Sequence, residues 1–286
     1  MIFKLLTFLL LLIAANSYSQ SFVYEKSIGE FSEATSFSIN PAGNIFVTDA
    51  GTNELIKLDK NGSIIVSRGG YGWAPSTFDY PADVFAQTLR IAVADKNNNR
   101  IQFFDKDLTF LSEFNTKEKD DELYSFQYPT ASAFSYQGDL FILDSDNSRI
   151  LKYNLTGDFI LEIGSYDAGD FSLNNPVTFA VSPDGKLFVI NENKIILFDQ
   201  FGTGLSFIDA GFNAENINIT FNNLVINNSV KIKYADLSSS PVILKEFKPD
   251  QDFINGDIIE ALLFESKLFI LTSRSIFVFN KFKNDK

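Results

Sequence analysis

The chain has 286 residues with 24 Lys and Arg against 36 Asp and Glu, a formal net charge of −12, and neither His nor Cys. This excess of negative charge argues against nucleic acids and anionic membrane surfaces as partners, because both would repel it. The absence of Cys and His excludes disulfides, thiol catalysis and histidine-bound zinc. A hydrophobic content of 45%, with 31 Phe, is enough to bury a large core.

The first residues have the pattern of a secretory signal peptide. Lys4 precedes an apolar run from Leu5 to Ala15, and small residues follow as far as Ser19. The run is short for a membrane-spanning helix, and small residues after it are typical of a cleavage site. We therefore expect residues 1–19 to be removed and the mature chain to be secreted, periplasmic or held in the cell envelope. An uncleaved N-terminal anchor is the alternative.

The first predicted strand, Ser21 to Gly29 (SFVYEKSIG), has no partner next to it in the sequence. The segment that follows, from Ser36 to Asp59, predicts three short strands separated by turns at Asn40 to Asn44 and at Ala50 to Asn53. Asn61-Gly62 then begins a hairpin into a fourth strand. Such a small antiparallel sheet leaves faces uncovered, so it needs neighbours of its own kind.

The connection from Gly69 to Phe78 contains three aromatic residues among glycines, and one of them is the only Trp of the chain. Its glycines do not predict a phosphate-binding loop, because no Lys and Ser or Thr follow them. Aromatic residues on a connection form either a lid over the core or a surface that binds a partner. Both possibilities stay open, and the candidate binding residues are Tyr71, Trp73 and Phe78.

The pattern of the first unit returns every 46 to 49 residues. An Asp or Asn closes the second strand of each of the first four units, at Asp49, Asp95, Asp144 and Asn191. A proline before the first strand keeps the same interval, at Pro81, Pro129 and Pro176. Two segments, Leu224 to Ala235 and Leu268 to Asn280, keep the strand and turn rhythm without these markers. Two markers with one period indicate a repeat, and we count six units.

A ring of six sheets also explains the isolated first strand. Ser21 to Gly29 is similar to Asp158 to Gly164, which is the fourth strand of the third unit, and the last unit has no fourth strand after Asn280. We therefore expect the N-terminal strand to complete the last sheet, which would close the ring and remove an exposed edge. The prediction is an all-β, six-bladed β-propeller of four-stranded antiparallel blades, formed by residues 20–286 as one domain.

The repeat resembles the NHL repeat, whose members form six-bladed β-propellers. The similarity is carried by VTDAGTNELIKLDKNG, VADKNNNRIQFFD and ILDSDNSRILKYNLTG, and it is clearest from Phe31 to Asp199. It implies the fold far more than the function, because such propellers include protein-binding, RNA-binding and enzymatic domains.

The Asp that closes each second strand predicts a structural turn. A carboxylate there can accept backbone N–H groups and orient an Arg five residues later. Asp95 with Arg100 and Asp144 with Arg149 have this spacing, whereas Asp49 has Glu54 at the same offset. We expect Asp49, Asp95 and Asp144 to stabilise turns rather than to bind a metal.

A metal site in the central channel is the alternative that enzymatic propellers suggest. Six residues are predicted to line the channel: Ser36, Asp83, Ser132, Thr178, Asn216 and Glu260. Asp83, Asn216 and Glu260 supply oxygen ligands suited to Ca²⁺. Propellers similar to gluconolactonases and paraoxonases hold a divalent cation with Glu, Asn and Asp, and Glu33 lies near where such a Glu would be. That family places Asn after the proline of the inner strand, where this chain has Ala82, Thr130 and Val177.

The sequence thus predicts an exported, monomeric binding or assembly module with no cofactor and no catalysis. Its partner would be a protein or another extracellular or envelope ligand, without nucleic acid and without a membrane-spanning segment in the mature chain. The alternative function is a metal-dependent hydrolase of the gluconolactonase or paraoxonase kind, with Ca²⁺ bound at Glu33, Asp83, Asn216 and Glu260.

Overall fold

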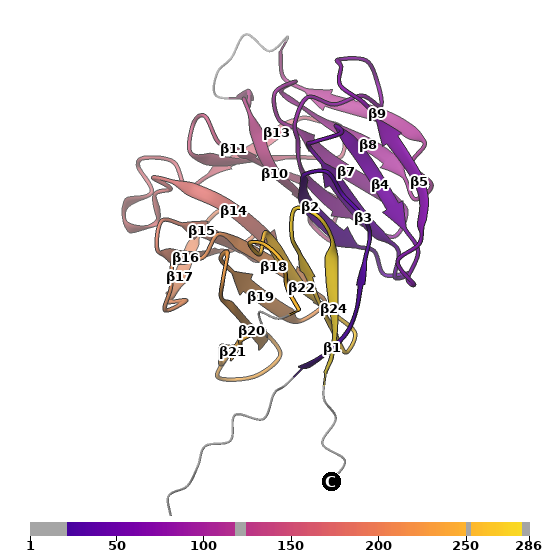
Figure 1. Cartoon of the computed structure of the whole chain (residues 1–286). Helices are drawn as coiled ribbons and strands as arrows, with labels where there is room; N and C mark the ends of the chain where they lie inside the picture. The colour runs from indigo at the N-terminus through magenta and orange to yellow at the C-terminus, as the bar shows by residue number, and fades with distance from the viewer. Residues whose placement is uncertain (1–21, 118–123, 250–252, 282–286) are drawn as a thin grey trace, which may run out of the picture.

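A computed structural model of the protein describes residues 22–117, 124–249 and 253–281. The expected signal peptide, residues 1–19, lies outside the described residues. Six four-stranded antiparallel sheets stand around a central axis as the blades of a propeller (Figure 1). Blades 1 to 5 each use four consecutive strands from β2 to β21, and blade 6 consists of β22, β23, β24 and β1. The predicted six-bladed β-propeller is confirmed.

The strands and one short 3-10 turn have the following bounds. In chain order they are β1 (Phe22–Ile28), β2 (Ala34–Ile39), β3 (Ile45–Asp49), β4 (Glu54–Leu58), β5 (Ile64–Gly69), β6 (Pro81–Ala86), β7 (Arg90–Asp95), β8 (Arg100–Asp105), β9 (Phe110–Asn115), β10 (Pro129–Phe134), β11 (Leu140–Asp144), β12 (Arg149–Tyr153), β13 (Phe159–Ile163), η2 (Gly169–Phe171), β14 (Pro176–Val181), β15 (Leu187–Asn191), β16 (Lys194–Phe198), β17 (Gly204–Ile208), β18 (Asn216–Thr220), β19 (Asn223–Asn227), β20 (Ile232–Asp236), β21 (Lys245–Phe247), β22 (Glu260–Phe264), β23 (Lys267–Leu271) and β24 (Ile276–Lys281).

The second strand of a blade is buried on both faces. Every residue of β3, β11 and β15 is buried, because neighbouring blades cover both sides of each sheet. Their sequences, IFVTD, LFILD and LFVIN, are therefore continuous hydrophobic runs rather than alternating ones. The outer strands β5, β9 and β17 are mostly exposed or half-buried. The polar residues that end the buried strands must consequently find partners inside the protein.

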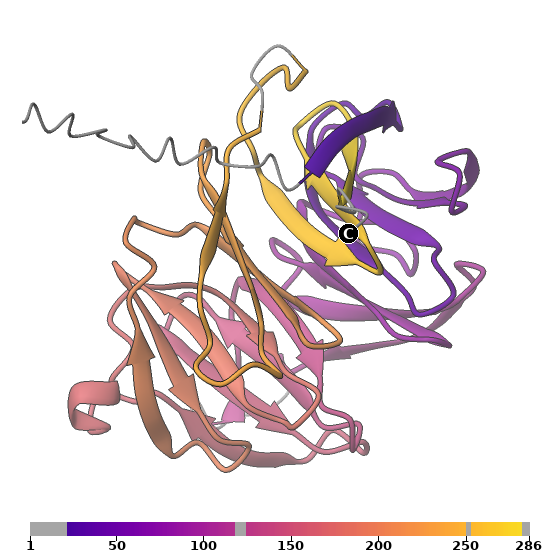
Figure 2. The same ribbon diagram turned by 90° about the horizontal axis from the view of Figure 1, so that it is seen from below.

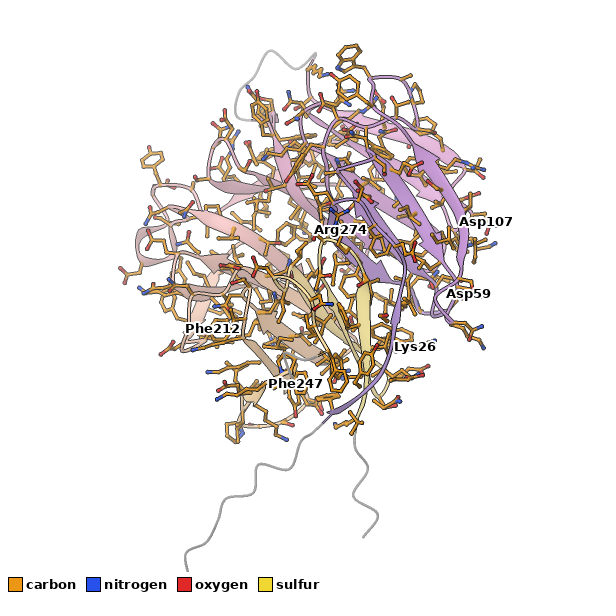
Figure 3. The ribbon with its side chains drawn as sticks, viewed as in Figure 1. Lys26, Asp59, Asp107, Phe212, Phe247 and Arg274 are labelled. Carbon is orange, nitrogen blue, oxygen red and sulfur yellow. The ribbon has the colours of Figure 1, made fainter. Side chains whose placement is uncertain are left out.

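The turns between strands follow from Asn, Asp and Gly. In blade 1 the side-chain oxygen of Asn40 accepts the N–H groups of Ala42 and Asn44, and Gly43 between them has φ +82°. In the turn after β4, the carboxylate of Asp59 accepts backbone N–H groups in the same way. The corresponding turn of blade 2, which contains Asp107, lies beside it along the same edge of the molecule (Figure 3). The ammonium nitrogen of Lys57 in blade 1 lies 2.9 Å from the carboxylate of Asp107, and this salt bridge links the two blades.

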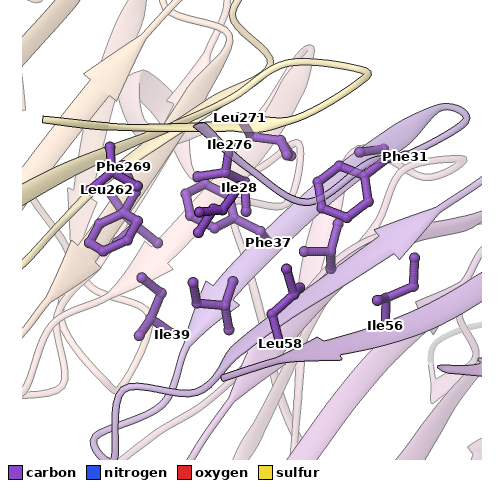
Figure 4. Close-up of a cluster of buried hydrophobic side chains, with 14 of the residues drawn as sticks. Ile28, Phe31, Phe37, Ile39, Ile56, Leu58, Leu262, Phe269, Leu271 and Ile276 are labelled. Atoms are coloured by element: carbon purple, nitrogen blue, oxygen red, sulfur yellow. The ribbon is translucent and has the colours of Figure 1, made fainter. Parts of the chain in front are cut away.

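The hydrophobic core lies in the spaces between blades. Figure 4 shows one such space, between blades 1 and 6, where side chains from several strands of the two blades meet. Ile28 of β1, Phe37 of β2, Leu58 of β4, Leu262 of β22 and Ile276 of β24 are all buried there. Each blade buries its two faces only against its neighbours, so the ring is stable only when it is closed.

Strand β1 closes the ring, as predicted. It pairs antiparallel with β24, with Phe22 opposite Lys281 and Ile28 opposite Ile276. In Figures 1 and 2 the indigo β1 lies beside the yellow strands of blade 6. Phe22 is fully buried, and its ring lies 5.3 Å from that of Phe247 in blade 5. The strand therefore fills the core as well as covering an edge. Within the described ranges, no helix has the length and apolar character needed to cross a bilayer.

Candidate binding surfaces

The connection between blades 1 and 2 forms a small aromatic hairpin, residues 69–78. The N–H of Gly72 donates to the carbonyl of Phe78, and the N–H of Phe78 donates to the carbonyl of Gly70. Tyr71 and Trp73 project from it, with 64% and 71% of their surface exposed. Their rings meet edge to face with centroids 5.9 Å apart. The hairpin thus presents two adjoining aromatic surfaces to solvent.

Phe78 is not part of this surface, so its prediction as a contact residue is wrong. Its side chain is fully buried among Phe46, Leu55 and Phe104 of blades 1 and 2. The hairpin therefore combines both possibilities that its sequence left open. Phe78 anchors the hairpin in the core, whereas Tyr71 and Trp73 face outward.

Polar side chains of β8 and of the turn before it hold the hairpin in place. Arg100 donates from Nη1 to the carbonyl of Trp73 at 2.8 Å, and from Nη2 to the carbonyls of Ala74 and Thr77 at 3.1 and 2.8 Å. Asn98 donates to the carbonyl of Gly72 at 2.9 Å. Arg100 and Asn98 are both buried. The hairpin backbone is therefore fixed from beneath by side chains that cannot move freely.

Asp95 holds Arg100 in turn. Its carboxylate lies 2.7 Å from Nε of Arg100 and also accepts the N–H of Asp79 at 2.8 Å. Nη1 of Arg100, which also donates to Trp73, lies 2.7 Å from Glu113 of β9. Arg100 therefore has two carboxylates and three carbonyls around it. This arrangement satisfies a buried guanidinium, which has five N–H donors.

The same device recurs in other blades. In blade 3, Asp144 lies 2.9 Å from Nε of Arg149 and accepts the N–H of Gln127. In blade 1, Asp49 has no Arg, and its carboxylate accepts the backbone N–H groups of four residues, Ser32, Glu33, Gly51 and Thr52. These carboxylates are thus occupied by hydrogen bonds of the turns around them. Glu54 begins β4 opposite Asp49.

A second set of polar side chains links the inner strands across the channel wall. Glu260 of blade 6 accepts the N–H of Phe37 in blade 1 at 2.8 Å. Asp83 of blade 2 accepts the N–H of Ser132 in blade 3 at 2.8 Å and the hydroxyl of Ser36 at 3.1 Å. Each of these side chains therefore reaches from its own inner strand to the next.

Asn218 of blade 5 extends this set, and the sequence did not predict it. It donates to Glu260 at 2.7 Å and more weakly to the carbonyl of Ala261 at 3.2 Å. Asn216, the predicted channel residue, lies at the start of β18 opposite Asn227. The contact of Asn218 with Glu260 was missed because blade 5 lacks the proline and the Asp that fix the register elsewhere.

The two channel carboxyl groups are weaker acids than ordinary Asp and Glu side chains. Burial raises the pKa of Asp83 to about 6, although hydrogen bonds from Ser132 and Ser36 oppose the shift. Burial also raises the pKa of Glu260 to about 7, opposed by Asn218 and reinforced by the negative charge of Asp83. Both groups thus resist ionisation at the pH where exposed carboxyl groups are fully charged.

A cavity of about 650 Å³ opens beside these carboxyl groups. Its lining includes five of the predicted channel residues, Asp83, Ser132, Thr178, Asn216 and Glu260, together with Asn218. Glu33 does not line it: it is exposed at the other end of the inner strand, before Ala34. The four residues of the alternative calcium site are therefore not brought together. Across the described residues, no group of three or more His, Cys, Asp or Glu side chains is placed to hold a metal ion.

The fold and these surfaces define a six-bladed β-propeller with one rigid aromatic hairpin and one channel cavity. No protein-family model matches the chain. It is 31% identical over 142 residues to Protein brain tumor of Drosophila melanogaster, which covers 48% of this chain and 13% of that protein. It is 34% identical over 82 residues to human NHL repeat-containing protein 3, covering 27% of this chain and 24% of that protein. These relatives confirm the resemblance to NHL-repeat propellers.

Solved structures of similar fold include enzymes. Virginiamycin B lyase from Staphylococcus aureus superposes with a TM-score of 0.62 at 12% identity over 90% of this chain and 99% of that one. A streptogramin B lyase gives 0.60 at 17% identity over 87% and 80%. Hydrazine synthase of Kuenenia stuttgartiensis gives 0.57 at 9% identity over 85% and 74%. At these identities the likeness concerns the fold alone.

Proposed function

We propose that the protein is an exported binding module that contacts a protein partner through the hairpin of residues 69–78. The observation that carries this proposal is the preorganised pair of exposed aromatic residues, Tyr71 and Trp73, on a backbone held by buried Arg100 and Asn98. Aromatic anchors on rigid supports dominate binding energies, because little conformational freedom is lost when they dock.

The relatives support a binding role without identifying the partner. The sequence matches are to NHL-repeat proteins, and each match spans less than a quarter of the relative's own length. The expected signal peptide places the mature chain outside the cytoplasm, in the periplasm, in the envelope or in the medium. The proposed form is a monomer, because β1 completes the last blade and the outer edge of each blade is a single short strand.

The proposal is tested by placing a photoreactive side chain at position 73 in the native host and isolating the crosslinked species. We expect one dominant crosslinked protein, which is identified by its mass and then produced separately. This partner should bind the Trp73→Ala variant at least thirtyfold more weakly than the unaltered chain, since an aromatic hot spot contributes about 2 kcal/mol or more. The control is Tyr166→Ala, which removes another aromatic side chain, 95% exposed, on a different connection. Equal effects of the two substitutions would contradict the proposal.

Metal-dependent hydrolysis is the second candidate, favoured by the two buried carboxyl groups of the channel. It has less support, because Glu33 does not line the cavity and the residue that donates to Glu260 is Asn218 rather than the predicted Asn216. The neighbouring lyases supply no site that can be carried over. One of them is inactivated by a histidine-to-alanine substitution, and this chain has no His. Hydrolysis of a lactone by the purified protein with CaCl₂, abolished by chelator and by Asp83→Ala, would replace the binding proposal.

A further inference from the structure

We propose that the channel cavity binds a small organic cation, an ammonium group carried on an apolar or aromatic body, with the ammonium placed at Asp83 and Glu260. This site is separate from the hairpin. The hairpin precedes Pro81 at the start of β6, whereas the cavity is lined by the later part of β6 and the turn after it, from Asp83 to Leu89. The two surfaces therefore lie at opposite ends of the same strand.

The floor of the cavity has negative groups without a positive partner. Among the described residues no Lys or Arg forms an ion pair with Asp83 or Glu260, whereas Asp95 and Asp144 each lie within 3 Å of an Arg. Asp83 and Glu260 have only hydrogen bonds from hydroxyl, amide and backbone groups. Two carboxyl groups in this state, Glu260 buried and Asp83 half-buried, are stabilised by a cation that reaches them.

An unpaired hydroxyl points to the same position. Ser132 is 3% exposed and lines the cavity, and its backbone N–H donates to Asp83. Its Oγ is buried and has no hydrogen-bond partner in the protein. Buried hydroxyl groups without partners are rare, because leaving one unsatisfied costs about 1–3 kcal/mol. Ser132 lies beside Asp83, and a turn of its side chain toward the cavity would offer this oxygen as an acceptor for the N–H of an ammonium group.

The walls and mouth suit an organic body rather than a bare metal ion. Five phenylalanines line the cavity: Phe85, Phe134, Phe179, Phe221 and Phe264. The exposed side chains Leu89 and Tyr136 stand at its rim. The volume of about 650 Å³ falls within the range of small-molecule sites. Aromatic walls around a carboxylate floor attract organic ammonium ions both by charge and through the faces of the rings.

A metal ion fits less well. Ca²⁺ takes six to eight oxygen ligands, and Mg²⁺ requires near-ideal octahedral geometry. The floor offers two carboxyl groups with four oxygens, which is fewer than Ca²⁺ takes, and each oxygen already accepts one hydrogen bond. A single ammonium needs only one charge and three acceptors, and the second lone pairs of the Asp83 and Glu260 oxygens supply them.

The charge of the floor makes binding depend on pH. The titratable or charged side chains that line the cavity are Asp83 on β6, Glu260 on β22, Arg90 on β7 and Tyr136 in the turn after β10. The guanidinium of Arg90 lies 3.7 Å from the ring centroid of Phe134, so it is held against the wall. Asp83 and Glu260 become more negative as the pH rises from 5 to 8. An ammonium should therefore bind more tightly at pH 8 than at pH 5.

The test is calorimetric titration of the full mature chain with 2-phenylethylammonium chloride, using 2-phenylethanol as the neutral isostere. We expect the ammonium to bind at least tenfold more tightly than the alcohol at pH 8, and at least fivefold more tightly at pH 8 than at pH 5. These comparisons use the unaltered protein, so they hold even if a variant does not fold. Equal binding of amine and alcohol, or no binding of either, would overturn the proposal.

Variants locate the site. Asp83→Asn and Glu260→Gln should each weaken 2-phenylethylammonium at least tenfold, whereas Asp59→Asn, which alters an exposed carboxylate on a turn after β4, should leave it unchanged. A separate titration with CaCl₂ distinguishes the cations. Calcium that binds at these residues while the amine does not would replace the organic cation with a metal site. Binding that is insensitive to all three substitutions would place the amine elsewhere and contradict the proposal.

Discussion

Arg100 is the residue on which the aromatic hairpin depends. It joins the buried carboxylate of Asp95 to the backbone carbonyls of Trp73, Ala74 and Thr77. Removing its charge leaves Asp95 buried without its cation and three carbonyls without their donor. Both consequences are costly in an interior from which water is excluded.

We therefore expect Arg100→Met to lower the free energy of unfolding by about 3–5 kcal/mol. The matched control is Arg68→Met, because Arg68 is exposed on β5 and donates only to the carbonyl of Ser67. Its substitution should change stability by less than about 0.5 kcal/mol. Urea denaturation followed by tryptophan fluorescence measures both, and Trp73 reports directly on the hairpin. Similar losses for the two variants would show that the buried pair contributes nothing special.

Glu260 lowers the stability of the folded protein in a pH-dependent way, and substitution of this residue isolates the effect. Its pKa rises from an ordinary value of 4.5 to about 7 in the folded protein. A folded state with the higher pKa holds its proton longer, so the native protein loses stability relative to the unfolded chain as the pH rises from about 4.5 to about 7. The loss is complete above that range and absent below it.

Glu260→Gln removes this penalty, because an amide does not ionise. We expect the stability difference between the variant and the unaltered protein to shift in favour of the variant as the pH rises from 5 to 8. The shift should be on the order of 2–3 kcal/mol, since one pKa unit corresponds to about 1.4 kcal/mol. Denaturant unfolding at four pH values measures it. A difference that stays constant with pH would contradict the raised pKa.

At this scale the sequence revealed local pairs and missed distant ones. Asp95 and Arg100 lie five residues apart on one hairpin, so their spacing alone predicts the contact that the structure shows at 2.7 Å. The bond from Asn218 to Glu260 joins two blades and depends on the register of β18, which no turn residue marks. Phe78 was misjudged because a sequence does not show which side of a short hairpin faces the core.

Among the elements, β1 has the largest effect on the architecture. Phe22 is fully buried against blade 5, while its neighbour Val23 is 47% exposed. We expect Phe22→Ala to cost about 3–5 kcal/mol, which is the usual loss for a buried Phe. Val23→Ala on the same strand should cost less than about 1 kcal/mol. Differential scanning calorimetry compares the two, and equal melting temperatures would mean that β1 does not hold the ring closed.

This closure could be predicted because the count of strands did not balance. Five units supply four strands each, and the last supplies three, so an unpaired strand at the start has one place to go. Blades 1 to 4 were equally predictable from the Asp or Asn that closes the second strand, and blades 2 to 4 also from the proline that begins the first strand. The bulge that shifts the register between the first two strands, as between Ala34 and Ser36, was not, because it depends on how neighbouring blades pack.

For the molecule as a whole, the predicted export would determine where any partner can be met. We expect the mature protein to begin near Gln20 and to appear in the periplasm or the medium of its native host. Intact mass spectrometry of the fractionated protein measures this directly. A protein that keeps Met1 and sediments with membranes would indicate the uncleaved anchor instead.

The pairing of Phe22 with Lys281 joins strands at opposite ends of the chain. During synthesis β1 emerges first and must wait for almost the whole polypeptide before its partner β24 leaves the ribosome. Until then blade 6 has an open edge, and Phe22 has no core to enter. The propeller therefore completes its ring only after β24 has been synthesised, and chains that stop short of β24 remain open and exposed to proteases.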